Sequence, residues 1–465
     1  MRKKKDTQGV LNFQRSSLTE TVKYYARYEA IDEILKRNPK IVDLVHRDLG
    51  KALENENRKR NRRCRYTSDN VLRILLCKAI EAESYRAITV RVDDSEFLRR
   101  FTRIHDKPMM GFAALNTLAN QIAPETWKKV NCTLSRQAMK DELIRGEKLR
   151  LDTTAVETNV HYPSDSSLLW DVYRVLARSI EKARELDATV VGDRRLQSKR
   201  AKKLSANISR MAGRKRKTLR TPYKALICLV EAILAWSQDV ATKLAKRQDR
   251  YGPVDYFIAK SLIEQVRHFA ELGARVVDQA QRRVLNGEQV PNEEKLFSIF
   301  EPHTELLKRG KAGKPIEFGH MVLLQQVDGK FITDYHVFEK KPVEHALIDT
   351  AIKSHTRLFG CPPEVLATDK GFYESMDRIA ELEEDIELVS IAKMGTRTAD
   401  ETKREGDVLF KMAQRFRAGI EGSISFLKRC LRLIRCFNKG LAHYHATVGL
   451  TVFAHNLIVL ARDTS

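Results

Sequence analysis

Three charged residues near the C-terminus are spaced to share one face of a helix. The stretch QRFRAGIEGSISFLKR sets Arg417, Glu421 and Lys428 four and seven residues apart. At about 100° per residue, these spacings bring the three side chains onto one stripe. A carboxylate between two cations suits a phosphate group, because the carboxylate can hold a divalent metal while Arg and Lys hold the phosphate backbone. The alternative is an ordinary solvated face with i,i+4 pairing.

Two aspartates occupy strand positions that suit the same chemistry. Asp152 lies in KLRLDTTAVET, whose alternation and Leu, Val and Thr content predict a strand. Asp369 ends the short strand in PEVLATDKGFYE, and ligand-binding groups gather where sheet strands end. Two divalent ions about 3.5–4 Å apart need carboxylate oxygens from several elements, and they can drive in-line displacement at a phosphate. Alternatively, Thr hydroxyls satisfy Asp152, Asp369 begins a turn and Glu421 is a surface residue.

The order of predicted elements indicates the fold that would position these carboxylates. After the Asp152 strand comes a strongly periodic helical insertion, and then a hairpin around Asp328-Gly329, which suits a tight primed turn. A helix ending at Gly360, the Asp369 strand, the strand DIELVSIAK, the Glu421 helix and a last apolar helix follow. Without the insertion, a three-stranded meander precedes alternating strands and helices. This is the order of a ribonuclease-H-like α/β core with a mixed five-stranded sheet.

The remainder of the chain is expected to be mostly helical. Between residues 20 and 140, Thr67 or Ser68, then Ser84 and Ser95, are candidate N-caps of successive helices. We therefore expect a helical N-terminal region that binds DNA or dimerises, a catalytic core in two parts, and a basic helical insertion after the first core strand. The expected ranges are 1–145 for the N-terminal region, 146–165 and 313–465 for the core, and 166–312 for the insertion.

The charge balance points to a polyanionic partner. The 465 residues include 84 Lys and Arg against 61 Asp and Glu, a net charge of +23, which favours nucleic acid. A membrane surface is the competing partner, but no run of about 18 uncharged apolar residues and no signal-peptide pattern supports it. The seven Cys are scattered without a C-x2-C pair, which argues against a disulfide framework and structural zinc and favours a cytosolic protein.

Two basic runs supply most of the candidate DNA contacts. One precedes the helix that begins near Thr67, and the other lies between two helices of the insertion; each is alternatively a solvated linker or loop. Lys370 and Tyr373, beside Asp369, are further candidates. The candidates within the two runs are Arg58, Arg60, Arg62, Arg63, Arg214, Lys215, Arg216 and Lys217.

These motifs resemble those of a bacterial insertion-sequence transposase of the DDE superfamily. The resemblance is to the ISNCY group, near relatives whose catalytic helix carries Y-x2-R-x3-E-x6-K. Outside the insertion, it covers the chain from residue 148 to the end. The matching stretches are LRLDTTAVETNVHYPSDSSLLWD, EFGHMVLLQ with ITDY, VLATDKGFYE, and QRFRAGIEGSISFLKRCLRLIRC with KGLAHYHATVGLTVFAHNL.

The resemblance implies roles for individual residues. Asp152, Asp369 and Glu421 match the catalytic triad, which would bind two Mg²⁺ ions, with Mn²⁺ able to substitute. Arg417 and Lys428 match the Arg and Lys of the helix signature. Gln414 stands where that signature has Tyr. We expect Gln414 to contact DNA and to hold the strand beside the scissile phosphate differently from the relatives' Tyr. The insertion follows the first strand, whereas in many relatives it precedes the helix of the catalytic Glu.

The implied function is DNA transposition. Such an enzyme binds the inverted ends of its element as double-stranded DNA, hydrolyses one strand at each end and joins the 3′-hydroxyls to target DNA. We expect a homodimer or higher oligomer on DNA, no membrane association, and a bacterial cytoplasmic location at the nucleoid. The alternatives are a ribonuclease-H-fold nuclease or resolvase without strand transfer, and a DNA-binding protein on a decayed transposase scaffold.

Overall fold

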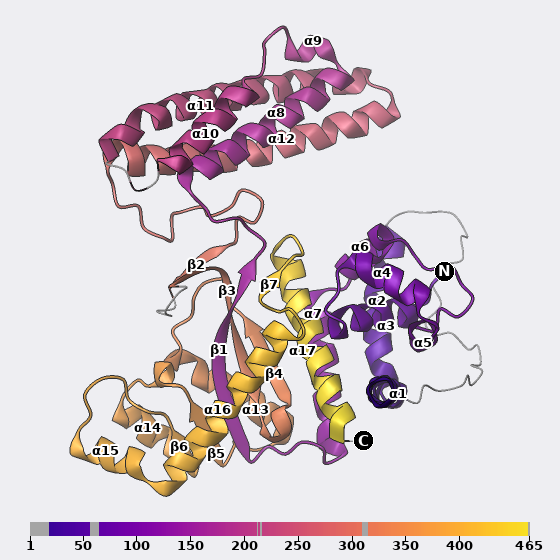
Figure 1. The fold of residues 1–465 in the computed structure, drawn as a ribbon, viewed down its shortest axis with the longest axis vertical. Helices are drawn as coiled ribbons and strands as arrows, with labels where there is room; N and C mark the ends of the chain where they lie inside the picture. The colour runs from indigo at the N-terminus through magenta and orange to yellow at the C-terminus, as the bar shows by residue number, and fades with distance from the viewer. Residues whose placement is uncertain (1–17, 56–64, 212, 214–215, 309–314, 464–465) are drawn as a thin grey trace. The chain divides into compact units, whose positions relative to one another are not determined.

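The chain divides into two compact units, and all three candidate carboxylates belong to the first. The computed structural model describes residues 18–55, 65–211, 213, 216–308 and 315–463. One unit joins Met1–Thr158 to Gly319–Ser465, and the other is Asn159–Phe318. Figure 1 shows the helices and strands of both units, coloured by residue number from the N-terminus to the C-terminus.

A mixed sheet carries two of the candidate carboxylates. Strand β1 pairs antiparallel with β3 and parallel with β5; β3 also pairs antiparallel with β4, and β6 is parallel to β5. Two further strands, β2 and β7, pair with β3 and β1 respectively. The strands are β1 (Lys148–Thr158), β2 (Glu305–Lys308), β3 (Ile316–Gln326), β4 (Ile332–Val337), β5 (Val365–Thr368), β6 (Leu388–Ser390) and β7 (Arg435–Cys436).

The α/β prediction is confirmed at the level of a mixed sheet with helices, but the sheet has seven strands rather than five. Strand β2 has four residues and β7 has two, too few to show a strand period in sequence. The β3–β4 hairpin is confirmed. Its loop spans Asp328–Lys330, with Gly329 at φ 70° and Lys330 at φ 66°, the left-handed region that primed turns use.

The helices of the core follow the predicted order. The predicted end of α13 is confirmed, because Gly360 caps it at φ 88°. The long helix α16 packs on β1, β5 and β6, and α17 follows it. The helices are α13 (Ile348–Phe359), α14 (Met376–Glu383), α15 (Ala399–Gly406), α16 (Val408–Arg429) and α17 (Leu441–Asp463).

The N-terminal helices share one hydrophobic core with the sheet and α17. That core includes Leu72, Trp127, Val156 and Phe453, which come from three helices and β1. Thr67 caps α3, with Asn70 completing a capping box, while Ser84 and Ser95 cap α4 and α5 as predicted. The helices are α1 (Thr19–Arg37), α2 (Pro39–Asn55), α3 (Ser68–Ile80), α4 (Tyr85–Asp94), α5 (Glu96–Phe101), α6 (Phe112–Asn120) and α7 (Pro124–Lys140).

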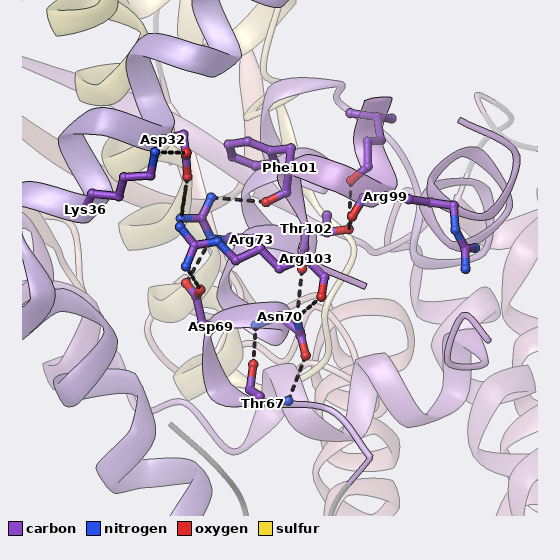
Figure 2. Close-up of polar contacts among 11 residues, drawn as sticks. Asp32, Lys36, Thr67, Asp69, Asn70, Arg73, Arg99, Phe101, Thr102 and Arg103 are labelled. Atoms are coloured by element: carbon purple, nitrogen blue, oxygen red, sulfur yellow. Dashed lines mark hydrogen bonds and ion pairs between the residues drawn. The ribbon is translucent and has the colours of Figure 1, made fainter. Parts of the chain in front are cut away.

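A buried charge network ties α1, α3 and the end of α5 together (Figure 2). The guanidinium of Arg73 contacts Asp69 at 2.9 Å and Asp32 at 2.6 Å, and Arg103 reaches the same carboxylates at 3.0 and 3.3 Å. The side chains of Arg73 and Asp69 are only 2% and 1% exposed. Buried charges persist only when they are paired and hydrogen-bonded, so each member of this network depends on the others.

The second unit is a helical bundle with its own core. Val172, Val230 and Val276 are completely buried in it and come from α8, α11 and α12. Gly273 permits close packing, because a β-carbon there would press on Val172 and Leu234. The helices are α8 (Asp165–Leu186), α9 (Ala188–Val191), α10 (Ser198–Arg210), α11 (Arg216–Arg247) and α12 (Pro253–Ala280).

Two helical segments are long and apolar enough to cross a membrane by length and composition alone, Thr218–Arg250 and Leu441–Arg462. Half of the apolar stretch in the first segment and most of that in the second are buried inside the fold. Core helices show this pattern as well, so these segments are weak evidence for a membrane.

The charge network predicts a large effect of removing one partner. Asp69→Ala removes the buried one of the two carboxylates that Arg73 and the half-buried Arg103 share, so the free energy of unfolding should fall by about 3–5 kcal/mol. Lys36→Ala removes an exposed partner of Asp32 from the same network and should cost less than about 1 kcal/mol. Urea denaturation of both variants measures the difference; equal costs would contradict the proposed dependence on burial.

Candidate active site

The pairing of β1 with β5 brings the two candidate aspartates to neighbouring positions. The parallel register aligns Leu151 with Thr368. Asp152 is the next residue of β1, and Asp369 directly follows the last residue of β5. Aligned residues of parallel strands project to the same side of the sheet, and Asp369 continues the extended conformation at φ −72° and ψ 166°. The register therefore puts Asp152 and Asp369 at neighbouring positions on the same side of the sheet, at the end of β5.

Asp369 also begins a tight turn. Its Oδ1 accepts a hydrogen bond from the backbone N–H of Gly371 at 2.6 Å, which is a typical role of Asp in turns. The turn interpretation is therefore confirmed for Asp369, and the turn fixes the direction of its carboxylate at the end of the strand.

Gln414 fastens α16 to the ends of β5 and β6. Its Nε2 donates to the backbone oxygen of Ser390 at 2.8 Å, to Ser390 Oγ at 3.0 Å and to the backbone oxygen of Thr368 at 3.3 Å. Thr368 directly precedes Asp369. We expected Gln414 at the DNA because of its place in the helix signature, but its amide nitrogen is directed at the strand ends and positions the helix.

A buried arginine holds the next turns of α16 over the sheet. Arg150 lies two residues before Asp152 on β1, so both side chains project to the same face. Its Nε donates to Gln326 Oε1 at 2.8 Å, its Nη1 donates to the backbone oxygen of Phe416, and its guanidinium lies 4.5 Å from the centre of the Phe416 ring. Gln326 also donates to Ser423 Oγ at 2.9 Å. Burial lowers the pKa of Arg150 to about 10.

The approach of α16 to Arg150 requires a glycine. A β-carbon at Gly419 would overlap Nη1 of Arg150, whereas one at Gly422 on the same helix would meet nothing within 4 Å. Glu421 lies two residues beyond Gly419, and Asp152 two residues beyond Arg150. The contact between Gly419 and Arg150 therefore limits how closely α16, which carries Glu421, approaches β1, which carries Asp152.

The predicted charged stripe is present on α16. Arg417 Nη1 binds Glu421 Oε1 at 2.8 Å, and the Glu421 side chain is 63% exposed. Lys428 lies in the last turn of the same helix and is half-buried. The i,i+4 pairing that we considered as the alternative is thus formed. An exposed ion pair contributes only about 0–1 kcal/mol. Either side chain can therefore leave the pair at little cost in free energy and bind another partner.

Asp152, Asp369 and Glu421 carry the oxygen donors that a hard divalent cation prefers, but the structure does not bring all three together. Oxygen donors are the ligands of Mg²⁺ and Mn²⁺, and Asp152 and Asp369 are adjacent by strand register. Across the described residues, however, no three or more His, Cys, Asp or Glu side chains converge closely enough to hold a metal ion. To complete a metal site with Asp152 and Asp369, the Glu421 carboxylate would have to leave Arg417 and bind the metal instead.

Glu344 is a site residue that the sequence reasoning missed. Its Oε1 accepts a hydrogen bond from Thr153 Oγ1, next to Asp152 on β1. A β-carbon at Gly371 would overlap Glu344 Oε2 and would lie 3.6 Å from Asp369 Oδ1. Glu344 therefore binds the strand that carries Asp152 and lies beside the turn that follows Asp369. It precedes the short turn His345–Leu347, and a single Glu before a helix gives no sequence signal for this role.

The two other candidates beside Asp369 differ in their surroundings. Lys370 is exposed. The hydroxyl of Tyr373 donates to Glu401 Oε1 at 3.1 Å, and Lys393 binds the same carboxylate at 2.8 Å. Burial and the hydrogen bond to Glu401 raise the pKa of Tyr373. The tyrosine is thus directed towards α15, while the lysine faces solvent.

The basic runs remain predictions. Arg58, Arg60, Arg62, Arg63, Arg214 and Lys215 lie outside the described residues. Arg216 and Lys217 belong to the first turn of α11, for which only the backbone is described.

Comparison with known proteins finds no match. No family model, no curated protein and no solved structure is similar to this chain at a significant level.

The two glycines of α16 give a matched test of how the helix is positioned. Gly419→Ala should displace Arg150 and its bond to Phe416, which destabilises the core by about 1–3 kcal/mol. Gly422→Ala enters open space and should stabilise the helix by about 0.5–1 kcal/mol. Thermal unfolding of the two variants measures the signs. A stabilised Gly419→Ala variant would show that Arg150 does not limit the approach of α16.

Proposed function

We propose that this protein is a DDE-type transposase that cleaves DNA at the ends of its element and joins the 3′-hydroxyls to target DNA. The observation that carries the proposal is the register of β1 and β5, which makes Asp152 and Asp369 neighbours. A late helix, fastened across both strands, carries Glu421. The net charge of +23 suits a DNA substrate.

The strand order supports a ribonuclease-H-like core. Among the predicted strands the order is β4, β3, β1, β5 and β6, with β3 antiparallel to β4 and β1, and β5 and β6 parallel to β1. This is the meander followed by parallel strands that the element order predicted. The short strand β2 also pairs with β3. The helical insertion leaves the core after β1 and returns at β3.

The reaction would be metal-assisted phosphoryl transfer. Bound Mg²⁺ or Mn²⁺ ions would activate a water or 3′-hydroxyl and stabilise the leaving oxygen. Asp152 and Asp369 would hold the metal, and Glu421 would complete the set after leaving Arg417. The released guanidinium of Arg417 can then donate two hydrogen bonds to a phosphate, and Lys428 on the same stripe can add a second cation.

Other residues would set the geometry of this centre. Gln414, Arg150 and Gly419 would fix α16 against the strands, while Glu344 would support the turn after Asp369, beside which it lies. Lys370 would approach the DNA backbone from solvent, and the basic runs would add affinity that depends on salt rather than sequence. Both element ends must react together, so the active form on DNA would be a dimer or higher oligomer in the bacterial cytoplasm.

Asp369→Asn is the direct test of the proposed chemistry. The substitution keeps an oxygen for the turn but removes the charge a metal requires, so end binding should persist while Mg²⁺-dependent strand cleavage falls by more than about a thousandfold. Asp377→Asn, which changes an exposed aspartate on α14, should cleave normally. Gel assays with labelled element ends measure both. Cleavage by Asp369→Asn at more than a trace would refute the assignment.

The Arg417–Glu421 ion pair favours a second candidate, a DNA-binding protein on the same scaffold without catalysis. In that protein the pair would be permanent and the carboxylates would bind no metal. Calorimetric titration with Mn²⁺ separates the two, because only the enzyme should bind the ion in a manner sensitive to Asp369→Asn. A nuclease that cuts without joining is distinguished by its failure to transfer precut ends.

A further inference from the structure

A large groove lies in the first unit, lined by residues other than the three candidate carboxylates. Its volume is about 820 Å³. One wall comes from α3, α4 and α6, and the other from the segment Leu431–Lys439 and the first half of α17. Arg435, which lines it, belongs to β7 and binds Glu157 at the far end of β1 at 2.8 Å. The groove therefore borders the strand that carries Asp152.

The groove is strongly cationic. Within the described part of the chain, no carboxylate pairs with Lys78, Arg432 or Lys439, all of which line it. The acidic residue in the lining is Glu83, whose carboxylate lies 3.5 Å from Arg91. Unpaired cations on opposite walls produce a positive potential that an anion lying between them would neutralise.

Lys78 is placed to receive such an anion. Its side chain is half-buried, and its ammonium lies 4.6 Å from the centre of the Tyr85 ring. Burial lowers the pKa of Lys78, because the charged form loses hydration without gaining a carboxylate. A phosphate in the groove would supply the missing counter-charge.

Exposed aromatic rings accompany these cations. Phe437 is 67% exposed and Phe112 is 44% exposed, and the guanidinium of Arg86 lies 4.7 Å from the centre of the Phe112 ring. Amide and hydroxyl groups of Asn116, Asn438 and other residues complete the lining. Cations that follow a backbone together with rings on which bases stack are the combination found in grooves for single-stranded nucleic acid.

We propose that this groove binds an unpaired DNA strand, with its phosphates on Lys78, Arg432 and Lys439 and a base stacked on Phe437. This inference rests on the proposed function, because it assumes that the protein acts on DNA. It adds a strand-binding site that is separate from Asp152, Asp369 and Glu421.

Charge reversal tests the phosphate contacts. The double variant Arg432→Glu, Lys439→Glu should bind a fluorescent oligothymidylate at least about tenfold more weakly, and the slope of log affinity against log salt should fall by about 0.7 for each lost contact. The control Lys411→Glu, Arg429→Glu makes the same charge change at exposed positions of α16 outside the groove. It should lose much less affinity, and equal losses would overturn the site. Circular dichroism checks that all variants fold.

A ring deletion tests base stacking. Phe437→Ala should weaken binding of the oligothymidylate by about tenfold and binding of a blunt duplex by much less. Ile434→Ala removes an exposed apolar residue from the same segment outside the groove lining and should change neither. Equal effects of the two substitutions, or equal competition by polyglutamate at matched charge, would overturn the assignment to an unpaired strand.

These measurements separate the groove from the catalytic proposal. Asp369→Asn should bind the oligothymidylate as well as the unchanged protein does. If groove variants lose strand binding while no metal-dependent cleavage is found in any variant, the groove stands and the proposed enzyme falls. If cleavage depends on Asp369 but neither groove substitution alters strand binding, the groove assignment falls.

Discussion

The parallel pairing of β1 with β5 is the constraint on which the candidate site depends. The register that aligns Leu151 with Thr368 makes Asp152 and Asp369 neighbours, although more than two hundred residues separate them in the chain. A shift of one residue in either strand would send one carboxylate to the opposite face of the sheet. The buried residues Leu149 and Leu366 hold the register, because a slip would move them out of the core.

The helix that carries Glu421 is held by polar contacts rather than by apolar packing alone. Gln414 binds the strand ends, and Arg150 binds the helix backbone at Phe416. Both contacts are directional, so they fix the position of α16 along the strands as well as its distance from them. Gly419 supplies the space that the arginine needs. Burying Arg150 costs solvation, which its hydrogen bonds and its contact with the Phe416 ring offset.

The N-terminal helices are joined to the sheet through α17 and a common core. Their internal order also depends on the buried pairs of Arg73 with Asp69 and Asp32. This shared core gives the cationic groove two walls that come from opposite ends of the sequence. A proposed strand-binding surface and a proposed catalytic sheet thus belong to one compact unit, while the insertion forms a separate bundle with its own core.

The sequence alone determined the elements whose signals are local. Alternation predicted β1, Gly360 marked the end of α13, Thr67, Ser84 and Ser95 marked helix starts, and residue spacing placed Arg417, Glu421 and Lys428 on one stripe. These signals depend on the period and conformational preferences of neighbouring residues, so they survive without tertiary context.

Only the tertiary structure decided the contacts between distant segments. It turned Gln414 towards the strand ends, placed Arg150 beneath α16 and set Glu344 beside Gly371. It also added β2 and β7, which are too short to carry a periodic signal. The direction of a polar side chain follows from which partner lies within hydrogen-bonding distance, and that partner is fixed by how the chain packs rather than by its neighbours in sequence.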